Sequence, residues 1–349
     1  MLERATANRQ PVSGTFELTA RCNLACGMCY IRKPANDRYE RSHELSAAQW
    51  VDVTQQAVAA GMVFLTLTGG EILIRKDFFD LYEPMTQMGL VITLFTNATA
   101  ITPAVAKRLA QSPPSRVEIS LYGASEAAYE RVTGTSNAYD KCLRGIRLLA
   151  EAGVNVVVKS TLTKYNAHEL DLMKRMAAEW GVPFFAASLL TQRRDDDLSQ
   201  IQDFRRQARE AIDLEEADAA TSAEIRAALA APPPAADADP FYCSAGKSSF
   251  TIGPFGQMSA CIDLPLPGAP VAEIGFAEAW RRVGEFVGSV PVNTSCSSCA
   301  LRSICPSCPA WSYGENRTLN QPVKYLCDLA AERKRRFGRA EPDVQAAGG

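Results

Sequence analysis

Six strand-like segments alternating with helix-like segments constrain the fold of this chain more than any other feature. The segments between the strands carry helix signals, such as the capping box of Ser46 with Gln49 and the stop at Gly61. Because strands joined through helices run parallel, this order predicts an α/β fold around a parallel sheet. The strand-like segments are short and rich in aliphatic and β-branched residues, and they lie at 15–20, 63–68, 91–95, 117–122, 154–161 and 183–188.

Such a sheet is either an open doubly wound layer or a curved partial barrel, and hydrophobic periodicity does not distinguish the two. In both architectures ligands bind at the carboxyl ends of the strands. The motifs of this chain that combine cysteine, glycine and polar residues follow strands directly. The sequence therefore predicts a binding site at that edge of the sheet.

The composition of the chain excludes several classes of protein. With 349 residues, 47% of them hydrophobic, the chain can bury a large core in one domain with an appendage, or in two domains. A net charge of −2 gives no basic field for nucleic acid or anionic membrane. No apolar run is long enough for a membrane span or signal peptide, which predicts a cytoplasmic protein. Only His43 and His168 are present, which argues against His-rich zinc catalysis and Ser-His-Asp chemistry.

Eleven cysteines in a cytoplasmic chain indicate metal binding, because thiols stay reduced in the cytosol. Cys22, Cys26 and Cys29 follow the first predicted strand with the spacing C-x3-C-x2-C. Three thiolates can hold three irons of a 4Fe–4S cluster and leave the fourth iron open to another ligand. The alternative is a zinc site, but structural zinc takes four ligands and no fourth Cys or His lies nearby in the sequence.

This motif, with the aromatic Tyr30 after its third cysteine, resembles the signature of the radical S-adenosylmethionine (SAM) superfamily. The resemblance covers residues 15 to about 190 and implies a partial (β/α)6 barrel whose cluster binds SAM and cleaves it reductively. Gly69, Gly70 and Glu71 resemble the family motif that holds the methionyl amine. Glycines let backbone approach a ligand, and a carboxylate pairs with an ammonium group.

The resemblance implies further SAM contacts at Asn97, Ser120 and Arg131, and Lys159 is a weaker candidate for the same pocket. Two positions depart from the family pattern. Ile72 stands where many relatives have proline, and Tyr122 stands where relatives often have aspartate.

Seven cysteines gather after residue 240 and include two C-x2-C pairs, which suit zinc sites and iron–sulfur clusters equally. Together with the first motif they resemble the SPASM domain of radical SAM maturases, which implies two auxiliary 4Fe–4S clusters and three clusters in all. Two residues separate Cys305 from Cys308, the fourth of the clustered cysteines, where the family pattern usually has three. Cys142 is left over as a packed core thiol, and Asp263 is an acid–base candidate by proximity to Cys261 only. The resemblance assigns the nearer auxiliary cluster to Cys243, Cys261 and Cys308, and the farther one to Cys296, Cys299, Cys305 and Cys327.

The predicted organisation is an extension at 1–14, a radical SAM barrel at 15–215, a helix and Pro/Ala linker at 216–240, a cysteine-rich domain at 241–330 and a tail at 331–349. The resemblance implies an enzyme that abstracts hydrogen from a peptide or protein side chain, leaving a cross-link or an oxidised residue. Because the first strand comes so early, a leader peptide is expected to need a separate binding protein. The electron donor is expected to be a flavodoxin or ferredoxin.

Two other functions stay open at this point. The first is a radical SAM enzyme acting on a small molecule or cofactor precursor. The second is a non-catalytic zinc or iron–sulfur scaffold, which metal and sulfide content would distinguish.

Overall fold

A computed structural model describes residues 2–194, 198–232 and 239–338 of the chain. The chain divides into two compact units, and we describe each by itself. The first comprises Met1–Arg205 with Cys243–Ser289, and the second comprises Arg206–Tyr242 with Val290–Gly349.

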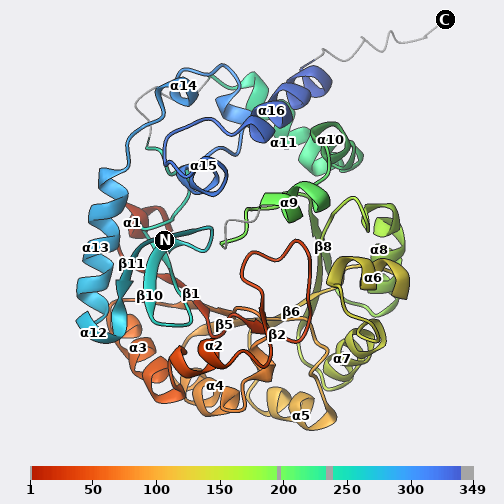
Figure 1. Cartoon of the computed structure of the whole chain (residues 1–349), viewed down its shortest axis with the longest axis vertical. Coiled ribbons are helices and arrows are strands. Elements are labelled where there is room, and N and C mark those ends of the chain that lie inside the picture. Colours follow the sequence, from red (N-terminus) through yellow and green to blue (C-terminus); the bar gives the residue numbers. More distant parts are fainter. Residues whose placement is uncertain (1, 195–197, 233–238, 339–349) are drawn as a thin grey trace, which may run out of the picture. The chain divides into compact units, whose positions relative to one another are not determined.

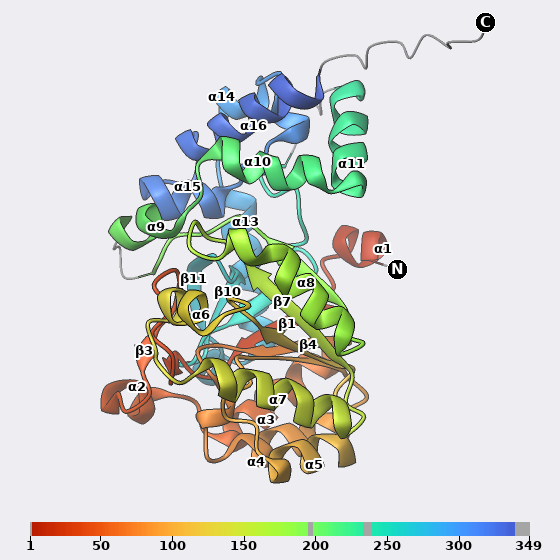
Figure 2. The same ribbon diagram turned by 90° about the vertical axis from the view of Figure 1, so that its right-hand side faces the viewer.

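The first unit is built on the predicted parallel sheet, and its strands lie within three residues of the predicted positions. Neighbouring strands pair in parallel and in chain order, which confirms the α/β prediction. The sheet curves into an incomplete barrel with helices along its outer face (Figures 1 and 2). The six strands are β1 (Ser13–Glu17), β4 (Phe64–Thr68), β5 (Val91–Thr96), β6 (Arg116–Ser120), β7 (Val156–Thr161) and β8 (Phe184–Ala187).

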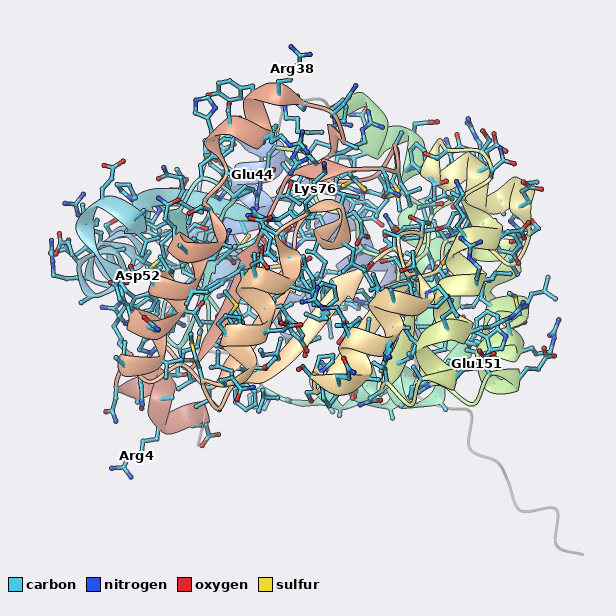
Figure 3. All side chains as sticks on the ribbon, turned by 90° about the horizontal axis from the view of Figure 1, so that it is seen from below. Arg4, Arg38, Glu44, Asp52, Lys76 and Glu151 are labelled. Atoms are coloured by element: carbon cyan, nitrogen blue, oxygen red, sulfur yellow. The ribbon has the colours of Figure 1, made fainter. Side chains whose placement is uncertain are left out.

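The first helix of the barrel begins at the predicted capping box and ends just before the predicted stop at Gly61. Ser46 forms the capping box with Gln49 at the start of this helix, and Thr102 caps the helix that begins at Pro103. The apolar faces of the barrel helices pack on the sheet, whereas charged residues such as Asp52 and Glu151 lie on the outside (Figure 3). The helices are α3 (Ala47–Ala59), α4 (Phe78–Thr86), α5 (Pro103–Gln111), α6 (Glu126–Thr133), α7 (Tyr139–Glu151) and α8 (Leu170–Glu179).

Three strands from the later part of the chain extend the same sheet, which corrects the predicted domain boundary. β9 (Ser249–Ile252) pairs in parallel with β1, and β10 (Gln257–Cys261) and β11 (Leu264–Pro270) continue the sheet in antiparallel fashion. The aromatic ring of Phe250 packs 6.3 Å from that of Phe16 and joins the buried core. Residues 243–289 therefore belong with the barrel and not with the remaining cysteines.

Shorter elements complete this unit. They are α1 (Leu2–Ala7), β2 (Arg21–Cys22), β3 (Lys33–Pro34), α2 (Arg38–His43), η1 (Ile72–Ile74), η2 (Ala167–Glu169), α9 (Leu198–Phe204), α12 (Val271–Ile274) and α13 (Phe276–Ser289).

The second unit is helical in its described residues, and it differs from the prediction at two points. Its first helix, α10 (Ala208–Ala217), was expected in the barrel domain, and α16 (Lys324–Phe337) continues into the expected tail. An ion pair of 2.6 Å between Arg333 and Glu215 joins these two helices, which explains why both belong to this unit. The other elements are α11 (Ala219–Ala230), α14 (Thr294–Ser297), η3 (Arg302–Ile304) and α15 (Pro309–Asn316).

Part of the predicted Pro/Ala linker, residues 233–238, and the end of the predicted tail lie outside the described residues. Within the described ranges, no helix combines the length and the apolar character needed to cross a membrane. The cytoplasmic location stays a prediction.

Candidate active site

A cavity of about 310 Å³ lies at the carboxyl ends of the barrel strands. Thr68 ends β4, Thr96 ends β5, Ser120 ends β6 and Thr161 ends β7, and all four residues border the cavity. This is the edge of the sheet at which the alternating pattern predicts ligand binding.

The three cysteines of the first motif all border this cavity. Burial, and after it the carboxylate of Glu71, raises the pKa of Cys22 to about 12. Burial also raises the pKa of Cys26 and of Cys29. Buried thiols lose their protons when a metal ion binds to the sulfur atoms. This set of sulfur donors therefore fits a soft metal centre. Within the described ranges, no three His, Cys, Asp or Glu side chains are placed to hold a single metal ion, and the cluster assignment rests on the motif and the cavity.

Backbone contacts hold the cysteine loop in place. The amides of Ala25 and Gly27 donate to the carbonyls of Thr133 (2.9 Å) and Val132 (3.2 Å) at the end of α6. The Arg32 guanidinium closes the loop from the other side by donating to the Cys26 carbonyl, 3.4 Å away. The loop therefore keeps its shape through contacts that do not use its thiols.

Gly69 and Gly70 lie where the end of β4 meets the chain segment that leads into Cys22. The Gly70 amide donates to the Thr19 carbonyl (2.7 Å) and the Glu71 amide donates to the Arg21 carbonyl (2.9 Å). A Cβ atom on Gly69 would overlap the Thr19 carbonyl oxygen, and one on Gly70 would overlap that of Arg21. The structure thus gives these glycines a second role beside ligand approach: they let two backbone segments dock directly.

Glu71 is fully buried, and it is not among the residues that border the cavity. Its carboxylate accepts hydrogen bonds from the Thr96 hydroxyl (2.8 Å), the Asn97 amide (2.7 Å) and the Leu73 amide (3.0 Å). Burial raises its pKa, and these three donors oppose that rise. In this structure Glu71 holds the end of β5 in place.

Asn97 connects this arrangement to the cysteine loop. Its side-chain amide donates to Asn23 (3.0 Å) and to the sulfur of Cys22 (3.7 Å), and its oxygen accepts from the Thr99 amide (2.9 Å). Asn97 also borders the cavity, as predicted. A hydrogen bond to a ligand sulfur is one of the means by which a protein sets the potential of an iron–sulfur cluster.

Lys159, and not Arg131, brings a positive charge to this cavity. Lys159 is the only cationic side chain among the described residues that border it, alongside Ser120 and Tyr122. Its ammonium group donates to Glu118 (3.1 Å), and burial lowers its pKa to about 8. Arg131 is exposed on α6 and does not border the cavity, and its guanidinium donates to the Tyr165 hydroxyl (2.8 Å).

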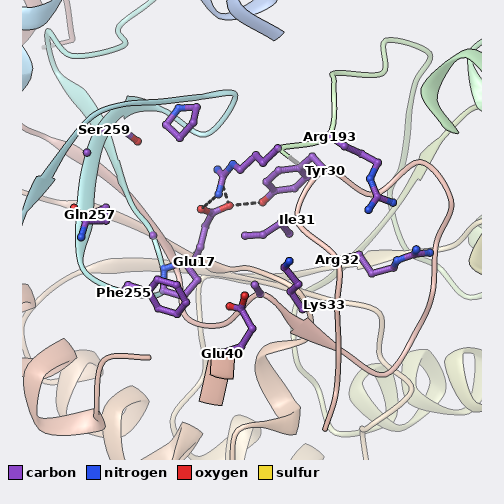
Figure 4. Close-up of a pocket in the computed structure, with 16 residues that line it drawn as sticks. Glu17, Tyr30, Ile31, Arg32, Lys33, Glu40, Arg193, Phe255, Gln257 and Ser259 are labelled. Atoms are coloured by element: carbon purple, nitrogen blue, oxygen red, sulfur yellow. Dashed lines mark hydrogen bonds and ion pairs between the residues drawn. The ribbon is translucent and has the colours of Figure 1, made fainter. Parts of the chain in front are cut away.

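Tyr30 borders the cavity and belongs to a buried network that sequence reasoning missed. Its hydroxyl donates to Glu17 (2.6 Å), and the Arg194 guanidinium pairs with the same carboxylate at 2.8 Å (Figure 4). The Arg194 amide also donates to the Tyr30 carbonyl (3.1 Å). Glu17 and Arg194 are 177 positions apart, so no local spacing could have connected them.

Four of the later cysteines meet in the second unit. They border one small cavity of about 140 Å³. Burial raises the pKa of Cys305 and of Cys327, and the thiols of the group contribute further to that rise. The structure therefore brings together the residues predicted for the farther auxiliary cluster, which are Cys296, Cys299, Cys305 and Cys327.

The residues predicted for the nearer auxiliary cluster come from both units. Cys243 and Cys261 belong to the first unit, and Cys308 belongs to the second. The half-buried Asp263 donates its amide to the sulfur of Cys261 (3.4 Å), and burial raises the pKa of its carboxyl group. Cys142 is fully buried on α7, where it was expected as a packed thiol.

The chain is similar to a known family and to several characterised proteins. Residues 16–176 match the family described as the Radical SAM superfamily. The mycofactocin maturase MftC of Mycolicibacterium smegmatis is 28% identical over 84% of this chain and 77% of its own. The AdoMet-dependent heme synthase of Methanosarcina barkeri is 25% identical over 85% of this chain and 91% of its own.

Among solved structures, Streptococcus suis SuiB bound to its precursor peptide SuiA has the same fold. It superposes with a TM-score of 0.70 at 19% identity, covering 93% of this chain and 78% of that one. The matched domain and the cysteine loop at the strand ends of the barrel lead to one conclusion: residues 16–176 form a radical SAM domain, and the chain is an enzyme of the radical SAM type.

Proposed function

We propose that Cys22, Cys26 and Cys29 hold the 4Fe–4S cluster of this enzyme and that SAM binds in the adjacent cavity. The observation that carries this proposal is that the three thiols border the same cavity of about 310 Å³ as the backbone of Gly69 and Gly70. The donor set fits, because three thiolates leave one iron of a cubane for the amine and carboxylate of SAM. When bound, cluster and SAM supply a 5′-deoxyadenosyl radical by reductive cleavage.

The residues of the chain bind and orient SAM in this proposal. Lys159 supplies the positive charge for the carboxylate of SAM, in place of Arg131, for which the resemblance implied a SAM contact. Ser120 and Asn97 offer polar groups from neighbouring strand ends, and Tyr30 closes the side of the cysteine loop. Leu190, which is buried, adds an apolar wall that helps to exclude water.

Glu71 acts as a positioning residue in this proposal. Its hydrogen bonds fix the end of β5, from which Asn97 reaches Cys22. The sequence predicted a direct contact between this carboxylate and the methionyl amine. The burial and the three protein donors of Glu71 favour the indirect role.

We propose that the radical abstracts hydrogen from a side chain of a peptide or protein substrate, as a step in its maturation. The relatives support this, because one is named as a maturase and SuiB was solved with a precursor peptide. A relative named heme synthase, at 25% identity, supports a second candidate, an enzyme acting on a small-molecule precursor.

We further propose two auxiliary 4Fe–4S clusters. The cavity bordered by Cys296, Cys299, Cys305 and Cys327 supports the farther one. The nearer one, with Cys243, Cys261 and Cys308, is supported by the sequence pattern alone. These clusters would accept the electron left after substrate oxidation. A flavodoxin or ferredoxin is the proposed electron donor, and a leader-peptide-binding protein is a proposed partner.

Anoxic expression together with short peptides encoded beside this gene tests the substrate proposal. Mass spectrometry is expected to show a peptide with a mass change that depends on Cys26. A small molecule modified in place of any peptide would favour the second candidate. Zinc without sulfide in the purified protein would favour the scaffold alternative.

A further inference from the structure

A second cavity of the first unit, about 370 Å³ in volume, lies beside the proposed SAM site. The residues after Cys29, helix α2 and the turn between β9 and β10 form its walls (Figure 4). Tyr30 borders this cavity and also the SAM cavity, so one side chain forms a wall of both. A group bound in the second cavity would therefore lie next to the place where the radical forms.

Most charges around this second cavity already have partners. Glu17 pairs with Arg194 at 2.8 Å and accepts from the Tyr30 hydroxyl. The Arg32 guanidinium donates to the Ala25 and Cys26 carbonyls. These groups hold the cysteine loop and leave little charge free for a ligand.

Glu40 and Lys33 are the exceptions, and Glu40 is the one of the two that is buried. Its side chain lies on α2 at the cavity wall, and the residue is only 7% exposed. Figure 4 shows its carboxylate directed toward the cavity, and no described residue forms a hydrogen bond or ion pair with it. Burial raises the pKa of this carboxyl group. The residue is buried, yet its carboxylate oxygens still reach the space of the cavity, which makes Glu40 a candidate charge partner for a ligand bound there.

The surroundings of Glu40 favour a cation. Phe255 borders the same cavity, and its ring lies 6.2 Å from that of Tyr39 and 6.0 Å from that of His43. A carboxylate beside aromatic faces is a common environment for ammonium and guanidinium groups. Lys33 also borders the cavity, and its charge opposes the rise in the pKa of Glu40, but its side chain is exposed and forms no ion pair with Glu40 in this structure.

We propose that this second cavity binds a basic side chain of the peptide substrate, with Glu40 as its charge partner and Phe255 as its aromatic wall. The proposal rests on the proposed peptide substrate and adds a recognition rule to it. The anchored residue lies on one side of Tyr30, and the residue to be modified reaches the SAM cavity on the other side.

Titration calorimetry under anoxic conditions tests this with the reconstituted full chain in the presence of SAM. The probes are three peptides, acetyl-Gly-Gly-X-Gly-Gly-amide, in which X is lysine, norleucine or glutamate. The lysine peptide is expected to bind about tenfold more tightly than the norleucine peptide, as one charge-assisted hydrogen bond supplies. Glu40→Gln is expected to remove that difference, whereas Lys33→Met is expected to keep it.

Any of four results would overturn the proposal. The lysine and norleucine peptides could bind with equal affinity, or the glutamate peptide could bind more tightly than the lysine peptide. The lysine peptide could fail to bind at millimolar concentration, or its preference could survive Glu40→Gln. The melting temperature and iron content of each variant are measured first, so a misfolded variant is replaced by Phe255→Leu, for which a weaker lysine preference is expected. If a neighbouring peptide is modified although no charge preference exists, this inference fails and the proposed function stands. If the preference exists but SAM is not cleaved, the proposed function fails instead.

Discussion

The two groups of cysteines differ in what surrounds them. Cys22, Cys26 and Cys29 lie in a loop at the strand ends and border a cavity of about 310 Å³ that is lined by polar and glycine residues. The four cysteines of the second unit border only about 140 Å³, and two of them, Cys299 and Cys327, are exposed.

We propose that this difference separates a site that must admit a second molecule from a site that only has to hold a metal centre. Three thiols with adjoining space leave a coordination position for SAM, whereas four thiols around a small space suit a closed cluster. We expect chemistry at the first group and electron transfer at the second.

Replacing Cys26 by alanine is expected to abolish SAM cleavage, because the cluster would lose one of its three protein ligands. The measurement is 5′-deoxyadenosine formation by the reduced protein under anoxic conditions. Cys142→Ala is the matched control, since Cys142 is also buried but borders neither cavity. Undiminished 5′-deoxyadenosine formation by Cys26→Ala would remove the first cysteine group from the proposed chemistry.

Replacing Cys296 by alanine is expected to leave SAM cleavage in place and to impair product formation. Iron content is expected to fall from about twelve to about eight atoms per chain if the farther cluster is lost. Metal analysis and product yield measure the two effects. Full product yield at the lower iron content would show that the second group is dispensable for the reaction.

Replacing Gly70 by alanine is expected to destabilise the cysteine loop, because the new Cβ would overlap the Arg21 carbonyl. We expect a cost of about 1–3 kcal/mol and weaker retention of the cluster. Gly288→Ala, in α13, is the control, since its Cβ would meet nothing within 4 Å. The melting temperature and the iron content of both variants are the readouts. A Gly70 variant as stable as the Gly288 variant would contradict the docking role of the glycine pair.

Replacing Lys159 by methionine is expected to raise the KM for SAM about tenfold, while Arg131→Met has a smaller effect. Because the pKa of Lys159 is lowered to about 8, its ammonium is charged below that pH and becomes neutral above it. The KM of the unaltered enzyme is therefore expected to rise above pH 8 more steeply than that of Lys159→Met. A larger effect at Arg131, or identical pH profiles, would restore the assignment made from the sequence.

The sequence predicted the barrel strands within a few residues because each strand carries its own hydrophobic signal. It missed that β9 joins β1, because the four residues Ser249–Ile252 are too short for a periodic pattern and the cysteines around them suggested a separate domain. Local sequence patterns determine the helices and strands. Domain boundaries depend on which apolar faces of those helices and strands pack together.

Some residues of the candidate site could likewise be predicted from the sequence, whereas others are revealed only by the fold. The three-cysteine motif was found from its spacing, whereas the glycine pair, Asn97 and Ser120 came from the family resemblance, and all of these residues border the cavity. The pairing of Glu17 with Arg194 joins residues that are 177 positions apart, so only the fold reveals it. The surface position of Arg131 depends on how α6 packs, which its place in the sequence does not determine.

Electron paramagnetic resonance of the reduced, anoxically reconstituted protein tests the central claim most directly, since SAM bound to the open iron changes the signal of that cluster. We expect added SAM to shift the spectrum of the unaltered chain. We expect no shift in a variant with alanine at Cys22, Cys26 and Cys29, although the signal from the second unit remains. A SAM-dependent shift that survives this triple replacement would show that SAM does not bind at a cluster held by these three cysteines.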